Sequence, residues 1–266
     1  MKHVTTLRVA AGQISSTRDT RENLAAIAEV VARAGAAGAR LVVLPEAAMA
    51  SFEMKLSVVA QPLDGPFADA LRGIAERHGV VLVTGMFTPA DEAGPDGRER
   101  VHNTLLVTGP GVEETTYRKV HLYDAFGTKE SDTVAPGDEY VTVEVDGWTV
   151  GLATCFDVRF AEQFTELGRR GADLVVLPAS WGDGPGKAEQ WDLLCQARAH
   201  DAQAWLLSCG QAWTSHSTKG PYGIGRSALV HPSGAVRARL GGEPDLLVAT
   251  IDRAVVAKVR EVTPIL

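Results

Sequence analysis

The sequence predicts an α/β fold, because strand-like and helix-like segments alternate along the chain. Short apolar runs rich in β-branched residues are followed by longer segments whose apolar residues recur at helical spacing. An eight-residue segment also occurs twice, at residues 38–45 and 171–178, with seven identical positions. The copies lie 133 residues apart, which is half the chain length. We therefore expect two related βαβ halves that form layers around one core, in a single domain spanning residues 1–266.

The expected elements begin with a strand at residues 7–14 and a helix that follows it. Asp19 is expected to cap this helix, with Glu22 three residues later completing a capping box. Either Gly35 or Gly38 would end it. The apolar face of the helix would consist of four residues at helical spacing, namely Leu24, Ile27, Val31 and Ala34.

The next segments continue the alternation of strand and helix. Within residues 39–46, five residues of buried-strand character stop at Pro45, and Glu46 stands just past the proline. Residues 66–78 predict a helix capped by Gly79, and residues 80–87 predict the strand after it.

Antiparallel pairs are expected in the middle of the chain. Residues 103–108 and 114–119 would pair through a Gly-Pro-Gly turn, and residues 140–145 would pair with the segment from Trp148 onward across Asp-Gly. Residues 90–100 contain the turn residues of a surface connection. Four further strands are expected at residues 173–177, 205–209, 226–231 and 246–251.

Composition and charge exclude several classes of function. Hydrophobic residues make up 45% and charged residues 22%, the balance of an ordinary globular protein. The net charge of −7 argues against a nucleic-acid or membrane partner. The three cysteines, Cys155, Cys195 and Cys209, have no CxxC spacing, so neither a disulfide framework nor a zinc site is indicated, and Cys195 and Cys209 are expected to be packing residues. We expect a cytoplasmic protein, because the amino end lacks a signal-peptide core and no apolar run could cross a bilayer.

Cys155 is the first candidate site residue, because the apolar run from Trp148 ends at it. Ligands of open α/β sheets bind at the carboxyl ends of strands. The spacing of Phe160, Phe164 and Leu167 predicts a helix just beyond, whose positive N-terminal end would favour the nucleophilic thiolate. The alternative is that Cys155 is a small apolar residue on a buried strand.

Three charged residues are the other candidates. Glu46 stands where the second copy of the repeated segment has Ala179, so the strand itself does not require an acid there. Lys119 begins an apolar segment, whereas lysines that protect a sheet edge alternate with polar neighbours. Glu130, taken alone, is an acid in a loop.

These residue types together fit covalent cleavage of a carbon-nitrogen bond. That reaction requires a nucleophile, a base that deprotonates it, an acid for the departing amine and positive charge for the oxyanion. A desolvated carboxylate can serve as the base, and a nearby lysine can stabilise the oxyanion. His121, two residues from Lys119, is the rival base.

Three motifs, in this order, resemble the Glu-Lys-Cys motifs of the nitrilase superfamily of carbon-nitrogen hydrolases: Leu-Pro-Glu at residues 44–46, Tyr-Arg-Lys-Val-His-Leu at 117–122 and Thr-Cys-Phe-Asp-Val-Arg-Phe at 154–160. The resemblance covers nearly the whole chain and extends to the Gly-x-Ser segment at residues 225–234. It implies a four-layer α-β-β-α sandwich built from two related halves around two mixed sheets. It also implies a homodimer or higher homo-oligomer that needs no cofactor and no metal.

The resemblance implies a role for each matching residue. Cys155 would be the nucleophile that forms an acyl-enzyme, and Glu46 would be the base and later the acid. Lys119 would stabilise the tetrahedral intermediate together with the backbone N–H of Phe156. Glu130 matches the family's second glutamate, which helps to orient the substrate and the catalytic groups.

Positions near the strand ends suggest further contacts with a substrate. Tyr123, Arg159 and Trp181 are expected to bind substrate, with core packing as the alternative for the two aromatic residues and helix capping for Arg159. Asp157 is expected to cap the helix that follows Cys155.

The residues around Cys155 also favour one branch of the superfamily. Cys-Phe-Asp-Val-Arg-Phe is similar to the Cys-Tyr-Asp-x-Arg-Phe of the omega-amidase-like and related aliphatic amidases, although Ala161 replaces the proline that follows in the family. The implied reaction converts a small-molecule amide and water into a carboxylate and ammonia. The alternatives are an N-carbamoyl amidohydrolase or a nitrilase with the same triad, and a catalytically silent binding subunit of the same fold.

Overall fold

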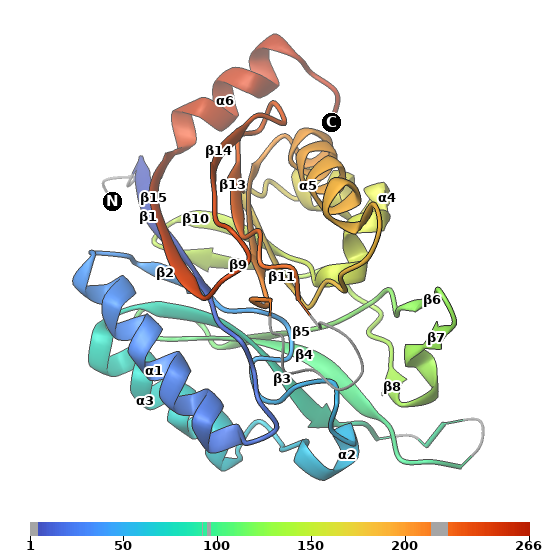
Figure 1. Cartoon of the computed structure of the whole chain (residues 1–266). Helices are drawn as coiled ribbons and strands as arrows, with labels where there is room; N and C mark the ends of the chain where they lie inside the picture. The colour runs from blue at the N-terminus through green and yellow to red at the C-terminus, as the bar shows by residue number, and fades with distance from the viewer. Residues whose placement is uncertain (1–4, 92, 95–96, 214–222) are drawn as a thin grey trace.

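The computed structural model describes residues 5–91, 93–94, 97–213 and 223–266, and its longer strands form two sheets (Figure 1). The first sheet has the order β15-β1-β2-β3-β4-β5, with β8 beside β4. Its central strands β1, β2 and β3 are parallel, whereas β15, β4 and β5 join it through antiparallel pairs. The strands of this sheet are β1 (Thr6–Gln13), β2 (Leu41–Val43), β3 (Val81–Pro89), β4 (Val101–Thr108), β5 (Thr115–Arg118), β8 (Val134–Ala135) and β15 (Asp245–Asp252).

The second sheet has the order β14-β13-β12-β11-β10-β9 and the same plan. Strands β10, β11 and β12 are parallel, and antiparallel pairs add β9 on one side and β13 with β14 on the other. A separate small hairpin is formed by β6 (Asp124–Ala125) and β7 (Thr128–Lys129). The strands of the second sheet are β9 (Thr142–Val145), β10 (Trp148–Leu152), β11 (Leu174–Ala179), β12 (Trp205–Gly210), β13 (Ala228–Val230) and β14 (Val236–Arg239).

The repeated segment of the sequence supplies the middle strand of each parallel group. Leu41 of β2 is in register with Val9 of β1, and Leu174 of β11 is in register with Val150 of β10. Every residue of β2 and β11 is buried, which explains why both copies are apolar runs without polar alternation. The expectation of two related halves around two mixed sheets is confirmed.

Helices cover the outer face of each sheet, and the inner faces pack against each other (Figure 1). Helices α1 (Thr20–Ala36) and α3 (Pro66–His78) lie on the first sheet, and α4 (Ala161–Arg169) and α5 (Lys187–Ala202) lie on the second. Since side chains alternate along a strand, Leu41 and Val43 join the apolar cluster between the sheets, while Val42 joins the cluster beneath α1 and α3. The layers therefore follow the expected order α-β-β-α.

The first two long helices begin and end close to the expected residues. The Asp19 carboxylate caps α1 by accepting a hydrogen bond from the Arg21 N–H at 2.8 Å. The expected capping box is wrong, because Glu22 accepts the Thr17 hydroxyl at 2.9 Å. Helix α3 has the predicted bounds and ends at Gly79, whose φ of 65° only glycine adopts without strain.

The expected antiparallel pairs also form, between β4 and β5 and between β9 and β10. The turn between β9 and β10 places Asp146 at φ 50° and Gly147 at φ 80°, the two positive values that a tight hairpin requires. The connection at residues 90–100 joins β3 to β4, although three of its residues, 92, 95 and 96, lie outside the described part of the chain.

The helix beyond Cys155 begins later than the sequence pattern predicts. A short 3-10 helix, η2 (Cys155–Arg159), comes first, and the extended backbone of Phe160 separates it from α4. Other elements are not among those expected from the sequence: β6, β7, β8, β14, α2 (Leu56–Val59), α6 (Arg253–Val262) and the 3-10 helix η1 (Glu130–Asp132). No helix within the described residues has both the length and the apolarity needed to cross a membrane.

Candidate active site

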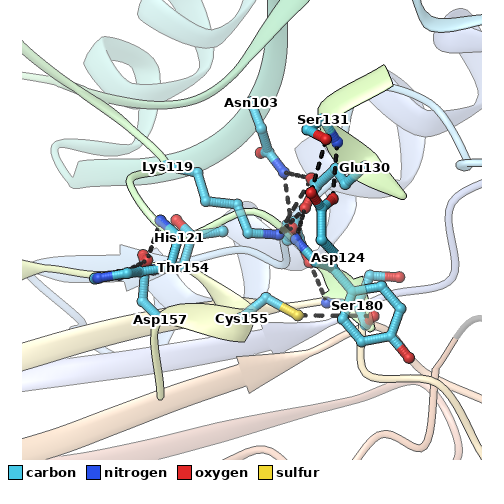
Figure 2. A network of polar contacts seen from close by, with 12 residues as sticks. Asn103, Lys119, His121, Asp124, Glu130, Ser131, Thr154, Cys155, Asp157 and Ser180 are labelled. Carbon is cyan, nitrogen blue, oxygen red and sulfur yellow. Dashed lines mark hydrogen bonds and ion pairs between the residues drawn. The ribbon is translucent and has the colours of Figure 1, made fainter. Parts of the chain in front are cut away.

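Four of the predicted site residues meet at one edge of the two sheets. Glu46 follows β2, Lys119 follows β5, Glu130 begins η1 and Cys155 begins η2. The Lys119 Nζ lies 2.9 Å from Glu46 Oε1 and 2.9 Å from Glu130 Oε2, and the three side chains are only 1–8% exposed. Figure 2 shows the Lys119, Glu130 and Cys155 side chains directed toward this common centre.

Electrostatic interactions tie Cys155 to this cluster. Burial raises the pKa of the Cys155 thiol well above its ordinary value, the Glu46 carboxylate raises it further, and Lys119 partly opposes both. The Sγ atom also lies 3.9 Å from the backbone oxygen of Ser180. The thiolate that the sequence pattern predicted is therefore not favoured, because η2 stands between Cys155 and α4 and the sulfur is desolvated beside a carboxylate. Such a thiol remains protonated until a base removes its proton.

The charged form of Lys119 is favoured in spite of its burial. Burial alone would lower the pKa of this ammonium, but the charges of Glu130 and Glu46 raise it well above the ordinary value. The backbone of Lys119 is fixed as well, because its N–H donates to the Asn103 oxygen at 2.9 Å and its oxygen accepts the Gly137 N–H at 2.8 Å. A side chain at Gly137 would place Cβ only 2.3 Å from the Arg118 oxygen. Only glycine therefore fits at position 137.

Glu46 is held by neutral groups that the sequence did not point to. Asn103 Nδ2 donates to Glu46 Oε1 at 2.7 Å, and the Ser180 N–H donates to Oε2 at 2.8 Å. The Gln211 side chain donates to the Glu46 backbone oxygen at 2.9 Å. Next to it, a Cβ on Gly85 would lie 2.8–2.9 Å from three atoms of the segment from Pro45 to Ala47, so the loop that carries Glu46 packs directly on the backbone of β3.

Backbone strain marks the turn that carries Cys155. Its φ is 47°, a value that non-glycine residues rarely adopt and that clusters at functional sites. The buried Asp157 holds this turn, because its carboxylate accepts the Thr154 N–H at 2.8 Å and the Tyr117 hydroxyl at 2.6 Å. Asp157 therefore caps η2, whereas the sequence predicted that it caps the longer helix.

The rival base, His121, is engaged by the same aspartate. Its Nδ1 and its backbone N–H lie 2.9 and 3.0 Å from Asp157 Oδ1, and its ring stacks on Phe160 at a centroid distance of 3.7 Å. In Figure 2 the His121 and Asp157 side chains lie together, apart from the Lys119 and Glu130 cluster. The geometry favours Glu46 over His121 as the group next to the thiol.

Phe156 lies next to Cys155 at the start of η2. The first hydrogen bond of this turn runs from the Asp157 N–H to the Thr154 oxygen at 3.0 Å. The N–H of Phe156 precedes it, and N–H groups at that position of a helix have no acceptor within the helix. Such a group can donate to an oxyanion beside Cys155.

The three residues expected to bind substrate lie in one cluster with Phe156, the residue that follows Cys155 in the chain. The Arg159 guanidinium lies 4.9 Å from the Trp181 ring centroid and 5.6 Å from that of Phe156, and the Tyr123 ring contacts Phe156 edge-on at 5.1 Å. Burial raises the pKa of Tyr123.

A second cation, Lys187, joins these residues. Its Nζ lies 3.5 Å from the ring centroid of Phe126 on the β6-β7 hairpin, and its pKa is lowered by burial and by Arg159. Arg159 and Lys187 are therefore two cations beside the same aromatic rings, those of Phe126 and Trp181. Within the described residues, no group of three or more His, Cys, Asp or Glu side chains could hold a metal ion.

Comparisons with known proteins point to one protein family. A family model described as carbon-nitrogen hydrolase matches residues 8–261. A hydrolase of Mycobacterium tuberculosis is 46% identical over 96% of this chain and 92% of its own. A deaminated glutathione amidase of Escherichia coli is 34% identical over 97% of this chain and 95% of its own, and an omega-amidase of Xenopus tropicalis is 32% identical over 92% of this chain and 88% of its own.

Solved structures share the fold. Nit3 of Saccharomyces cerevisiae, a member of branch 10 of the nitrilase superfamily, superimposes with a TM-score of 0.83 at 27% identity over 98% of this chain and 95% of its own. A mutant amidase from Nesterenkonia sp. AN1 superimposes with a TM-score of 0.76 at 27% identity over 96% and 94% of the two chains. That protein carries the acetamide moiety of fluoroacetamide covalently at its active-site cysteine.

Proposed function

The chain belongs to the carbon-nitrogen hydrolase family, and on that premise we propose that it hydrolyses a small carboxamide to a carboxylate and ammonia. The observation that carries the proposal is the buried cluster in which Lys119 contacts Glu46 and Glu130 beside the Cys155 thiol. This cluster contains the nucleophile, the base and the cation that covalent amide cleavage requires. The covalent adduct on the cysteine of the Nesterenkonia amidase supports the same assignment.

In the first step Glu46 removes the proton from the Cys155 thiol as the sulfur attacks the amide carbon. A base is needed because the pKa of the buried thiol is well above neutral. The carbonyl π electrons move onto oxygen as the carbon-sulfur bond forms. The Lys119 ammonium and the Phe156 N–H stabilise the resulting oxyanion, and a buried, preformed pair of donors is worth more there than in water.

In the second step the tetrahedral intermediate collapses and the carbon-nitrogen bond breaks. Glu46 now gives its proton to the departing nitrogen, which leaves as ammonia, and a thioester remains on Cys155. Water then attacks the thioester while Glu46 accepts a proton, and the second collapse releases the carboxylic acid and restores the thiol. Glu130 contributes by fixing Lys119, because its two carboxylate oxygens accept hydrogen bonds from Nζ at 2.9 and 3.2 Å.

The two cations beside the aromatic rings support a substrate with an anionic group. Arg159 and Lys187 both lie over the Phe126 and Trp181 rings, and they would bind a carboxylate at the far end of the substrate from the amide. Tyr123 and Trp181 would contact the apolar chain between the two ends. The omega-amidase and deaminated glutathione amidase names of two relatives are consistent with such a substrate.

An N-carbamoyl compound or a nitrile would be processed by the same three groups, and a silent binding subunit would process none. The test is ammonia release from a panel of short amides with and without a terminal carboxylate, beside N-carbamoyl and nitrile analogues. Mass spectrometry of Cys155 after brief incubation should show an acyl adduct for true substrates only. Cys155→Ala should abolish turnover and the adduct, while Cys195→Ala, a matched change of a buried cysteine on α5, should preserve both. Turnover by Cys155→Ala would refute the mechanism.

Assembly and compartment are part of the same proposal. We expect a homodimer or higher homo-oligomer that acts in the cytoplasm without a cofactor, consistent with three buried cysteines that form no disulfide. Light scattering coupled to size-exclusion chromatography would test the oligomeric state, and the activity of protein dialysed against a chelator would test the absence of a required metal.

A further inference from the structure

We propose that Asn103 is a positioning residue that holds Glu46 and Glu130 around Lys119 and keeps the Glu46 carboxylate ready to accept the Cys155 proton. The inference rests on the proposed function, because it assigns Glu46 as the base of that reaction. Asn103 is a neutral residue in the middle of a strand, so no sequence motif marks it as part of a site.

The contacts of Asn103 reach every charged member of the cluster. Its Nδ2 donates to Glu46 Oε1 at 2.7 Å and to Glu130 Oε1 at 3.3 Å, and its backbone oxygen accepts the Lys119 N–H at 2.9 Å. The side chain is 1% exposed, and Figure 2 shows it directed from β4 toward Lys119 and Glu130. A single residue thus fixes two carboxylates and the backbone of the lysine between them.

The chemistry of an amide fits this position. The cluster contains two carboxylates and one ammonium, and the Asn103 NH₂ group offers one N–H to each carboxylate without adding charge. The Oδ1 atom of the same amide is buried and has no hydrogen-bond partner among the described residues. A buried amide that leaves its oxygen unsatisfied is costly, so stability alone does not favour asparagine here. The cost of the unsatisfied oxygen must therefore be offset by the two hydrogen bonds that the Asn103 NH₂ group donates to the carboxylates.

The groups that face Glu46 define what the loss of Asn103 would do. Oε1 accepts from Asn103 and Lys119, Oε2 accepts from the Ser180 N–H, and the Cys155 thiol lies beside the carboxylate. Glu130 faces the same ammonium from η1. Without the Asn103 donor the Glu46 carboxylate loses one of the hydrogen bonds that fix Oε1, so it is less well placed to accept the proton of the thiol.

The test is the pH dependence of Cys155 alkylation by iodoacetamide, measured by mass spectrometry in the wild type and in Asn103→Leu. Leucine has the same branched arrangement of heavy atoms, although it is larger, and it has no donor. The alkylation rate at neutral pH should fall about tenfold, as expected for the loss of one hydrogen bond to a charged group, whereas the rate at a pH high enough to ionise the thiol without a base should match the wild type. An unchanged rate at neutral pH, or an equal fall at both pH values, would overturn the inference.

Thr104→Val is the matched control, because Thr104 is the next residue on β4, is equally buried, and bonds to Thr88 away from the cluster at 2.9 Å. Its alkylation profile should match the wild type. If Asn103→Leu does not fold, Asn103→Ser keeps a smaller polar side chain and should also lower the alkylation rate at neutral pH. Alkylation needs no amide substrate. A lower rate at neutral pH in a protein that hydrolyses no amide would refute the proposed function alone, whereas amide turnover with an unchanged alkylation rate would refute the positioning role alone.

Discussion

Replacement of Lys119 by methionine tests whether the ammonium compensates the two buried carboxylates. Methionine fills a similar volume but leaves Glu46 and Glu130, which are 1% and 8% exposed, facing each other without a cation. Removal of one partner from a buried ion pair costs about 3–5 kcal/mol. We therefore expect the free energy of unfolding at neutral pH to fall by that amount, and kcat to fall by about 10²–10³ because the oxyanion loses its cation.

The stability difference between Lys119→Met and the wild type should depend on pH in a defined direction. Folding raises the pKa of Lys119, so its contribution to wild-type stability is fully present below its unfolded value of about 10.4 and is lost only as the pH rises through the higher folded value. In Lys119→Met the repulsion between the carboxylates is relieved when one of them takes up a proton. The stability deficit should therefore shrink as the pH is lowered from about 7.5 to about 5.

Urea unfolding followed by circular dichroism at both pH values measures the effect. Lys129→Met is the matched control, because Lys129 pairs with Asp132 on the surface with both side chains at least half exposed. Such a pair contributes about 0–1 kcal/mol. If Lys119→Met unfolds within about 1 kcal/mol of the wild type at both pH values, the ammonium does not hold the carboxylates together and the electrostatic account of the site is wrong.

Three further predictions follow from single contacts. Gly85→Ala should destabilise the protein and lower kcat more than it changes KM, because the added Cβ would collide with the loop that carries Glu46. Urea unfolding measures the stability and steady-state kinetics measure kcat and KM. A variant with the stability and kcat of the wild type would contradict the close packing. The ultraviolet absorbance of the wild type and of Cys155→Ala should show no thiolate difference between about pH 6 and about pH 8, because the pKa of the thiol is raised; a difference within that range would contradict the burial effect. Arg159→Ala should raise KM for amides with a carboxylate about tenfold and leave neutral amides unaffected, and an equal change for both would refute the anion contact.

The fold could be predicted from the sequence wherever periodicity and capping agree. The repeated segment, the helix that ends at Gly79 and the hairpin across Asp146 and Gly147 are all found as expected. Each follows from local rules of burial or of positive φ. Short pieces such as β14, in which arginines alternate with half-buried residues, depend on a neighbouring strand and carry too weak a pattern to predict.

The candidate site was predictable in part, for physical reasons. The structure brings Glu46, Lys119, Glu130 and Cys155 together, and their catalytic roles stay predictions. The thiolate was mispredicted because desolvation depends on tertiary packing that no local pattern reveals. Asn103 was missed because an uncharged strand residue gains its importance only from distant partners.

The placement of the two proton-transfer partners has a consequence for the whole protein. Glu46 is anchored at the end of β2 in one sheet, and Cys155 at the end of β10 in the other. The distance from acid to sulfur therefore depends on how the apolar layer between the sheets is filled, which includes Val43 and Leu152. A methyl group added or removed deep in that layer would change the reactivity of the Cys155 thiol without contacting it. Each half of the chain carries only one of the two proton-transfer partners, the Glu46 carboxylate or the Cys155 sulfur.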